Sequence, residues 1–560
     1  MPHVVTQACC GDASCVFACP VNAIHPNPHD EAFALAEMLY IDPVACVDCG
    51  ACVEACPVAA IAPENKLGPA QLPFVQINAL FHQDPPARPA QAPVPPIVRI
   101  DTTRTRTPLR VAVVGSGPAA LYAADELLKQ PDVHVNVFER LPVPYGLVRS
   151  GVAPDHPETK TIARLFRDIE DRPGFHYVLG VDVGRDLSHA ELMAHHHAVI
   201  YATGASQDRR LGIVGEDLPG STTATEFVAW YNGHPDHAER SYDLSHERAV
   251  IVGNGNVALD VARILATDPD DLAGTDISDR ALSALRQSRI REVVVLARRG
   301  PAQMAGTLPE LTGLLGRSDL DVVVDGAVPT PTGDVDLVTE QKLAALRALP
   351  TADRPRDARR RIVLRYLTSP LSVEGTDRVT GVHVVHNELV RDVDGGVRAV
   401  PTQTTDTIAT GLLLRSIGYR GRPVTDMPFD DRAGIIPNDA GRIHGRPGAY
   451  AVGWIKRGPT GFIGTNKSCA RETVNQLLSD VNAGLLADPR SDQRSLAELV
   501  GQRCPDAGDV VAWRRIDDLE RARGQASGRP RVKFTDIEEL RVALANAAPP
   551  RAGRRLVRRG

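Results

Sequence analysis

The chain has 560 residues, which is enough for roughly three or four domains. Its 43% hydrophobic and 24% charged residues are ordinary for a globular protein, and a net charge of −6 gives no support for general nucleic-acid binding. No apolar run reaches the length of a membrane span, the N-terminus lacks the features of a secretion signal, and the ten cysteines do not form a disulfide scaffold. We therefore expect a cytoplasmic protein that uses neither a membrane nor a nucleic acid.

Acidic residues dominate the first 65 positions, which contain eight Asp or Glu and no Lys or Arg. Such a unit either docks on a basic surface of the remaining chain or is simply kept soluble by its charge. The charge alone favours neither interpretation.

The same 65 residues contain two similar halves. The stretches CVFACPVNAIHP and CVEACPVAAIAP share the pattern C-V-x-x-C-P-V-x-A-I-x-P, which predicts a helical turn and a short strand in each half. Eight of the ten cysteines lie before residue 57, which indicates a local metal site in a reducing compartment.

The second half carries a complete iron–sulfur run, C-x2-C-x2-C-x3-C followed by proline. In proteins with two clusters, the fourth cysteine of such a run ligates the other cluster. The predicted ligand sets are Cys19, Cys46, Cys49 and Cys52 for one [4Fe-4S] cluster, and Cys9, Cys15 and Cys56 for the second cluster. A zinc site or spare thiols are the alternatives, and the matched half-runs favour iron–sulfur.

The first half has Asp12 where the regular run has its second cysteine. Three thiolates without a fourth favour a [3Fe-4S] cluster. Asp12 is the alternative ligand for a fourth iron, giving an Asp-ligated [4Fe-4S] cluster, but its oxygen should hold that iron more weakly than a thiolate would. Cys10 is out of register, and we expect it to be a spare or packing thiol.

Residues 66–108 show no clear period and include the Pro-rich stretch QDPPARPAQAPVPP. Proline-rich segments are extended and semi-rigid. We therefore predict a linker here.

A strand, a Gly-rich turn and an amphipathic helix begin at residue 109, in LRVAVVGSGPAALYAADELL. Gly115 permits the tight turn, and Gly117 lets the backbone approach a pyrophosphate at the start of the helix. Glu139 ends the next strand, VHVNVFER, where an acid binds ribose hydroxyls. This combination predicts a nucleotide without a 2′-phosphate, either FAD or NAD.

The same pattern recurs in RAVIVGNGNVALDVARILA, with Gly253 and Gly255 in the turn. The next strand, EVVVLARR, ends in Arg298 and Arg299 instead of an acid. Two guanidinium groups suit a 2′-phosphate and predict NADP, whereas a solvated arginine pair is the alternative. The stretch LAGTDISDRALSALRQS is expected to be an insertion between the helix and this strand. Strands alternating with helices predict doubly wound α/β domains.

With these motifs in place, the chain resembles two known families. Residues 1–65 resemble a bacterial two-cluster ferredoxin. The chain from about residue 109 onwards resembles the adrenodoxin-reductase-like ferredoxin–NADP reductases, through PVPYGLVRSGVAPDHPETK, YATGA, GNGNVALDVAR and GWIKRGPTGFIGTN. As a whole it resembles a fused ferredoxin/ferredoxin–NADP reductase.

The resemblance implies an α/β fold in which a small α+β two-cluster ferredoxin domain precedes two doubly wound dinucleotide-binding domains. The implied boundaries are 1–65 for the ferredoxin domain, 66–108 for the linker, 109–214 with 422–560 for FAD, and 215–421 for NADP.

The resemblance also implies further cofactor contacts. For FAD they are Ala119, Glu139, Leu147, Val183, Trp454, Gly461, Phe462 and Ile463. For NADP they are Arg210, Asn254, Gly255, Asn256, Val257, Arg298, Arg299, Glu310 and Gly461.

Two further positions, His156 and Asp260, match family positions near the flavin and the nicotinamide. Hydride transfer needs positioning more than acid–base chemistry, because the cofactors carry the reaction. Whether the two act chemically or only through hydrogen bonds stays open. The triplet His195–His197 does not suit one metal ion, and we expect it at the surface or in a turn.

The implied function is an NADPH-dependent ferredoxin reductase with a built-in ferredoxin. NADPH would give a hydride to FAD, and single electrons would then reach the iron–sulfur clusters and an external one-electron acceptor such as a ferredoxin or a cytochrome. Two alternatives are a flavoprotein like the small subunit of glutamate synthase and a non-catalytic redox sensor or electron-wire subunit. A thioredoxin-reductase-like role lacks the C-x-x-C motif it would need in the nucleotide domain.

Overall fold

The computed structural model describes residues 1–83, 96–101, 108–330, 335–355, 359–392 and 396–547. The chain divides into two compact units. Unit 1 comprises Met1–Pro95, Ser150–Ile162 and Gln207–Tyr419, and unit 2 comprises Pro96–Arg149, Ala163–Ser206 and Arg420–Gly560. The domain boundaries predicted from the sequence stay predictions.

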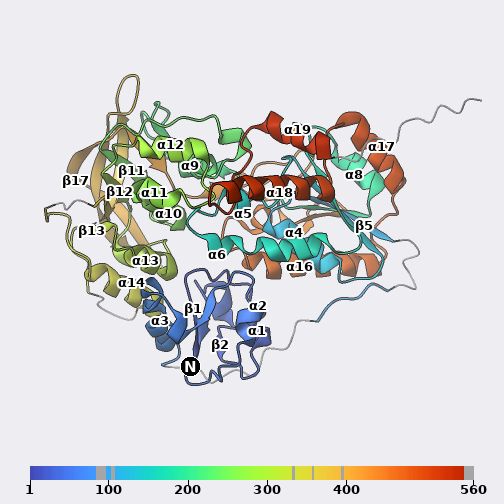
Figure 1. Ribbon diagram of the computed structural model, residues 1–560, viewed down its shortest axis with the longest axis horizontal. Helices are drawn as coiled ribbons and strands as arrows, with labels where there is room; N and C mark the ends of the chain where they lie inside the picture. The colour runs from blue at the N-terminus through green and yellow to red at the C-terminus, as the bar shows by residue number, and fades with distance from the viewer. Residues whose placement is uncertain (84–95, 102–107, 331–334, 356–358, 393–395, 548–560) are drawn as a thin grey trace, which may run out of the picture. The chain divides into compact units, whose positions relative to one another are not determined.

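The N-terminal part of unit 1 repeats one small motif (Figure 1). Strand β1 pairs antiparallel with β4, and β2 pairs antiparallel with β3, while helices α1 and α2 pack against each other. The elements are β1 (His3–Val5), α1 (Ser14–Ala18), β2 (Ile24–His25), β3 (Tyr40–Ile41), α2 (Ala51–Ala55) and β4 (Ile61–Pro63). The two halves match the internal repeat of the sequence.

The beginning of the predicted linker is folded, which the sequence pattern did not indicate. Helix α3 (Pro73–Phe81) packs on the cysteine-rich part, and its Asn78 is buried. The side-chain amide of Asn78 donates to Val5 O at 2.9 Å, and its oxygen accepts from the backbone N–H groups of Val5 at 3.1 Å and Ile41 at 2.9 Å. One side chain thus joins both small sheets. Most of the Pro-rich stretch, residues 84–95, lies outside the described residues.

Within the described residues of unit 1, six parallel strands form one sheet in the order β10-β18-β11-β12-β14-β13. These strands are β10 (Ser221–Thr223), β11 (Arg248–Val252), β12 (Glu292–Leu296), β13 (Asp321–Asp325), β14 (Arg361–Arg365) and β18 (Leu412–Arg415). The accompanying helices are α6 (Pro157–Lys160), α9 (Ala224–Tyr231), α10 (Asn256–Ala266), α11 (Pro269–Leu272), α12 (Asp279–Arg286), α13 (Leu308–Leu315) and α14 (Leu337–Arg347). Helix α12 comes from the predicted insertion.

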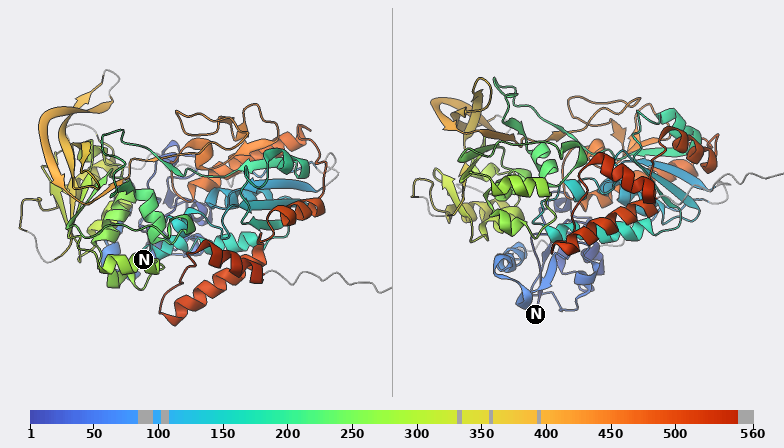
Figure 2. Two further views of the ribbon diagram at one scale, coloured as in Figure 1. Left: turned by 90° about the horizontal axis from the view of Figure 1, so that it is seen from above. Right: turned by 45° about the horizontal axis from the view of Figure 1, so that its top comes forward.

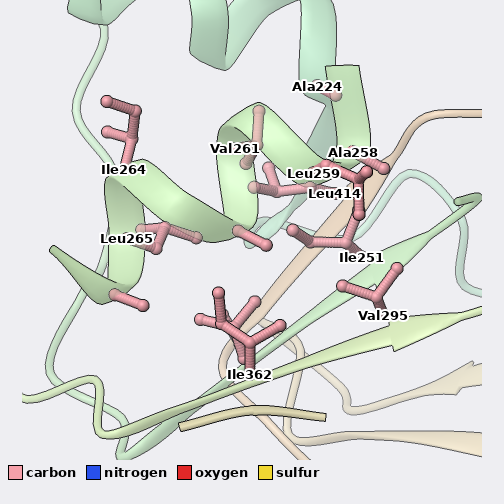
Figure 3. Close-up of a cluster of buried hydrophobic side chains, with 14 of the residues drawn as sticks. Ala224, Ile251, Ala258, Leu259, Val261, Ile264, Leu265, Val295, Ile362 and Leu414 are labelled. Carbon is pink, nitrogen blue, oxygen red and sulfur yellow. The ribbon is translucent and has the colours of Figure 1, made fainter. Parts of the chain in front are cut away.

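Helix α10 is anchored to this sheet by an apolar face. Figure 3 shows Leu259 and Leu265 of the helix beside Ile251, Val295 and Ile362 of the strands, all fully or almost fully buried. This packing fixes the start of α10, where the second Gly-rich turn lies. Strands β15 (Thr368–Glu374), β16 (Gly381–Arg391) and β17 (Val397–Ala409) form a separate antiparallel sheet, visible as the long curved ribbons of Figure 2.

In the described part of unit 2, seven strands form a sheet in the order β20-β21-β22-β8-β5-β6-β7. The stretch from β22 to β7 is parallel, and β20 and β21 add antiparallel pairs at one edge. The strands are β5 (Leu109–Val114), β6 (Val133–Glu139), β7 (Phe175–Leu179), β8 (Ala198–Tyr201), β20 (Asn438–Asp439), β21 (Arg442–Ile443) and β22 (Ala449–Ala451).

Helices α8 and α17 cover one face of this sheet, because Leu192, Leu496 and Val500 share a buried cluster with Ala112 and Val199. Helix α4 packs against α16 and α7. The helices of unit 2 are α4 (Pro118–Leu127), α5 (Leu147–Ser150), α7 (Ala163–Glu170), α8 (His189–His195), α15 (Trp454–Arg457), α16 (Thr465–Asn482), α17 (Gln493–Arg503), α18 (Val510–Ala526) and α19 (Ile537–Ala547). The α/β fold class predicted from the sequence is confirmed.

Candidate functional site

Four cysteines from both halves of the repeat line one cavity. Its empty volume is about 290 Å³, and the cysteines are Cys19, Cys46, Cys49 and Cys52. Cys49 is exposed, while Cys19 and Cys52 are buried. The backbone N–H of Ala23 points to the Cys19 sulfur at 3.3 Å. The predicted ligand set of the [4Fe-4S] cluster is therefore gathered around one space.

A second cavity, with an empty volume of about 240 Å³, is lined by the other predicted set. Its polar lining residues are Cys9, Cys10, Asp12, Cys15 and Cys56. Backbone N–H groups of Leu39 and Ala60 donate to the sulfurs of Cys9 and Cys56 at 3.5 and 3.3 Å. Such N–H···S bonds are the usual surroundings of cluster thiolates.

The thiols of both cavities fit a metal cluster better than free cysteines. Burial raises the pKa of Cys9 and of Cys52 to about 11, and raises the pKa of Cys15 well above its usual range. Neighbouring thiols and Asp12 raise the Cys15 pKa further. A thiol must be deprotonated to act as a ligand. Several buried thiolates close together repel one another and are stable only when a cation balances their charge. The donor sets suit iron–sulfur clusters.

Asp12 lines the second cavity, where it was predicted as a candidate ligand. Its two carboxylate oxygens accept hydrogen bonds from the backbone N–H and the hydroxyl of Ser14, at the start of α1. Cys10, which the sequence analysis set aside as out of register, is buried and lines the same cavity. Asp12 and Cys10 therefore both line this cavity beside the three cysteines of the predicted set.

The first Gly-rich turn, in unit 2, leaves room for a phosphate. Gly115 has φ +104°, and a Cβ there would lie 2.6 Å from the carbonyl oxygen of Ala202. Among the described atoms, none lies within 4 Å of the place of a Cβ on Gly117, the N-cap of α4. The turn is thus packed closely against the backbone at Gly115, while Gly117 leaves space at the start of α4. A pyrophosphate bound at the helix N-terminus requires this space.

Glu139 is held at the end of β6 by the same turn. Its Oε2 accepts from the backbone N–H and hydroxyl of Ser116 at 3.1 and 2.6 Å, and its Oε1 accepts from Leu141 N at 3.0 Å. Burial raises its pKa, while these hydrogen bonds favour the carboxylate. Ser116 was missed in the sequence, although its place between the two glycines is a usable signal. The acid is positioned to accept ribose hydroxyls.

Other segments that carry predicted flavin contacts meet this turn. Gly146, next to Leu147, lies so close to Gly117 that a Cβ added to Gly146 would be 3.1 Å from the Gly117 Cα. A Cβ added to Gly453 would be 2.5 Å from the Ala119 Cβ. Leu147 is 47% exposed, which leaves an apolar side chain available to an aromatic cofactor. The segment around Gly453 and the 461–463 turn are both tied to α16, since Gly453 N donates to the Cys469 sulfur at 3.3 Å and Phe462 N donates to the Thr465 hydroxyl at 2.9 Å.

The second Gly-rich turn, in unit 1, repeats this arrangement. Gly253 has φ +117°, and a Cβ there would lie 2.1 Å from the carbonyl oxygen of Ser416. The side-chain oxygen of Asn256 accepts from Thr307 N at 2.8 Å, which ties the turn to the start of α13. Arg298 and Arg299 follow β12 and are both exposed. The pair is free to meet an anionic group.

His156, Asp260 and Glu310 come together in unit 1, each offering one atom within 4.8 Å of the others. His156 Nδ1 lies 4.0 Å from Asp260 Oδ1. The buried guanidinium of Arg263 donates to Asp260 at 2.7 Å and to Asp155 at 2.7 and 3.0 Å. Together with Arg263, these side chains form one polar cluster of fixed charges.

Arg263 lowers the pKa of its neighbour Asp155, whereas the rise in the pKa of Glu310 has other causes. Burial acts to raise the pKa of Asp155, but the charge and hydrogen bonds of Arg263 outweigh burial and bring that pKa to about 2. Burial and the nearby Asp260 raise the pKa of Glu310. Arg263 lies three residues after Asp260 on α10, a spacing that the sequence analysis could have used.

Two residues predicted to contact a cofactor, Arg210 and Val183, interact in this structure with protein groups. Arg210 pairs with the exposed Asp217 at 2.5 Å, and Val183 forms a bridge with Leu187. The prediction placed His195–His197 at the surface or in a turn. The triplet does lie where α8 ends and turns into β8, but it is not at the surface, since all three side chains are buried. His196 bonds to Leu192 O at 2.8 Å, and burial lowers its pKa to about 4, so it serves the fold as a neutral ring.

Comparison with known families matches two separate parts of the chain. A 4Fe-4S dicluster domain matches residues 8–60, and the pyridine nucleotide-disulphide oxidoreductase family matches residues 109–299. A protein of Mycobacterium leprae described as "Probable ferredoxin/ferredoxin--NADP reductase" is 54% identical over 568 residues, covering 98% of this chain and 99% of that protein.

The chain belongs to the ferredoxin/ferredoxin–NADP reductase family. It is an oxidoreductase, and the family resemblance noted from the sequence is confirmed. Within the described residues, no helix combines the length and the apolar character needed to cross a bilayer.

The reductase part of this family member has solved relatives. The structure titled "Mycobacterium tuberculosis FprA in complex with NADPH" shares 46% identity and a TM-score of 0.74, covering 78% of this chain and 100% of that one. Human mitochondrial NADPH:adrenodoxin oxidoreductase is 42% identical, covering 78% of this chain and 92% of that protein.

Proposed function

We propose that this protein oxidises NADPH and delivers the two electrons, one at a time, to an external one-electron acceptor. The observation that carries the proposal is the presence, in one chain, of two open Gly-rich turns and two cysteine-lined cavities. The oxidation of NADPH to NADP⁺ releases two electrons and a proton, so two acceptor molecules are reduced per NADPH.

The cofactors divide between the sites by charge. The turn at Gly115 with Glu139 suits FAD, because an acid accepts ribose hydroxyls and repels a 2′-phosphate. The turn at Gly253 with Arg298 and Arg299 suits NADP(H). When bound, the flavin exchanges electrons in pairs or singly and the iron–sulfur clusters exchange them singly. His156, Asp260 and Glu310 would orient the nicotinamide end of NADP(H).

The cluster types are part of the proposal. The first cavity, with four cysteines, suits [4Fe-4S], and the second suits [3Fe-4S] or an Asp-ligated [4Fe-4S] cluster. The variant Asp12→Cys is expected to convert the second centre to a stable [4Fe-4S] cluster, because a thiolate holds the fourth iron more firmly than an oxygen. EPR of anaerobically purified protein should then lose the oxidised [3Fe-4S] signal.

The matched control for this prediction is Cys10→Ala, which removes the other candidate donor of the cavity. The control should keep the wild-type EPR signal. If the [3Fe-4S] signal survives in Asp12→Cys, the assigned ligand frame is wrong.

The proposed activity is tested with FAD-loaded protein, NADPH and cytochrome c or ferricyanide as the acceptor. Two molecules of acceptor should be reduced per NADPH. Absence of reduction by protein that retains flavin and iron would reject the enzyme and favour the sensor or electron-wire alternative.

A further inference from the structure

Helix α13 is shared by the N-terminal cysteine-rich segment and the second Gly-rich turn, both within unit 1. At its start, Leu308 N donates to the carboxylate of Glu37 at 2.6 Å, and Glu37 also pairs with Lys342. The Leu308 side chain is buried in the core cluster of the cysteine-rich segment. One residue earlier, Thr307 N donates to Asn256 in the Gly-rich turn at 2.8 Å. The first turn of α13 thus holds both partners.

A second contact runs through the next turn of the helix. The side-chain amide of Gln7 donates to Glu310 Oε2 at 3.0 Å. Glu310 belongs to the polar cluster with His156 and Asp260, and its other charged neighbour is Arg263, whose Nη1 lies 3.9 Å away. Gln7 therefore supplies a direct hydrogen bond that holds this carboxylate in place.

We propose that Gln7 is a positioning residue for the NADP(H) site, so that docking of the cysteine-rich segment on α13 and binding of NADP(H) strengthen each other. The proposal deepens the function above and rests on it, because it takes Glu310 and the 254–257 turn as the NADP(H) site. Coupling between two binding events is reciprocal, so whatever docking adds to NADP(H) affinity, NADP(H) adds to docking.

The physical reason is preorganisation. A carboxylate that is nearly buried among Asp260 and His156 loses its orientation when its hydrogen-bond donor is removed, and an amide-to-carboxylate bond is of the stronger, charge-assisted kind. An anion at a helix N-terminus also stabilises the first turn, so Glu37 fixes the end of α13 that holds Asn256. Both contacts order the site before the nucleotide arrives.

Two glycines of α13 and its C-cap, Gly313 and Gly316, allow this proposal to be tested by alanine substitution. A Cβ on Gly313 would lie 2.2 to 2.4 Å from the amide atoms of Gln7 and must displace them from Glu310. A Cβ on Gly316, the C-cap of α13, would make ordinary contacts at 3.4 Å with Ala70 and the Thr312 carbonyl oxygen and would not reach Gln7. Alanine favours a helix more than glycine does, so neither variant should lower the Tm.

We expect Gly313→Ala to weaken NADP⁺ binding about 5- to 20-fold, the lower range of allosteric couplings. The control Gly316→Ala should bind as the wild type does. Equilibrium titration of the full-length holoprotein with NADP⁺ measures both. In steady state, Gly313→Ala should raise KM for NADPH with kcat changed less than about twofold, because binding alone is weakened.

Gln7→Ala should reproduce the effect of Gly313→Ala, and iron counting must show that both retain the wild-type iron. The proposal is overturned if Gly313→Ala and Gln7→Ala bind NADP⁺ like the wild type, or if Gly316→Ala is weakened equally. Failure of the underlying function looks different, because then the wild-type protein itself would not bind NADP⁺.

Discussion

Replacing Arg298 and Arg299 together by alanine is expected to lower kcat/KM for NADPH about 100- to 10,000-fold while leaving kcat/KM for NADH nearly unchanged. Both side chains are exposed directly after β12, where the second Gly-rich turn would place the adenine ribose. Hydrogen bonds to charged groups contribute about 1.5 to 3 kcal/mol each. NADH lacks the 2′-phosphate and so loses nothing when the arginines are removed.

The matched control removes two other exposed arginines, Arg289 and Arg291, which precede the same strand. This double variant has the same net charge but leaves the end of β12 intact. It should keep the NADPH preference of the wild type. An unchanged NADPH/NADH ratio in the Arg298→Ala, Arg299→Ala protein would show that the 2′-phosphate assignment is wrong.

Glu520→Gln is expected to destabilise unit 2 by about 3 to 5 kcal/mol, because it leaves buried arginine charge unpaired. Glu520 is fully buried in α18 and accepts from Arg149 at 2.8 and 2.5 Å and from Phe534 N at 2.9 Å. Arg149 follows Leu147 in α5, so the variant should also release FAD more readily. Urea unfolding followed by flavin fluorescence measures both effects.

The pH dependence of this ion pair has a definite sign. Burial acts to raise the pKa of Glu520, but Arg149 and Arg531 outweigh it, and the net pKa is lowered. A carboxylate with a lowered folded-state pKa stabilises the fold above its unfolded pKa of about 4.3 and loses that contribution as the pH falls through the folded value. The difference between wild type and Glu520→Gln should therefore be largest near neutral pH and shrink in acid.

Asp518→Asn provides the control on the same helix, since Asp518 is exposed. Its free energy of unfolding should stay within about 0.5 kcal/mol of the wild type. Equal unfolding curves for Glu520→Gln and wild type at neutral pH would contradict the structural role of the Arg149–Glu520 pair.

The sequence predicted the parts of this protein whose signals are local. A Gly-rich turn between a strand and a helix is a contiguous pattern, and both turns lie where the pattern indicates. The cysteine spacing likewise predicted the set of cysteines that lines the first cavity and three of the four that line the second, all but Cys10, because the repeat implies that the fourth cysteine of each run crosses over. These signals depend on a few neighbouring residues only.

The remaining features depend on residues far apart in the chain. Gln7 and Glu310 are separated by 303 positions, and Arg149 and Glu520 by 371. The residues of helix α3 were predicted to be part of a linker. The helix is held by contacts distant in sequence, because Asn78 bonds to the backbone of both small sheets. The exposure of the histidine triplet was mispredicted for the same reason, because the turn from α8 into the central strand β8 is buried by elements that the local pattern does not show.

The central claim is that NADPH oxidation and one-electron transfer are joined in this single chain. The most direct measurement is an anaerobic titration of the full-length holoprotein with NADPH, followed by absorbance and low-temperature EPR. We expect the protein to accept two electrons per NADPH and its iron–sulfur EPR signals to change as NADPH is consumed. Bleaching of the flavin with iron–sulfur signals that remain unchanged after excess NADPH would contradict it.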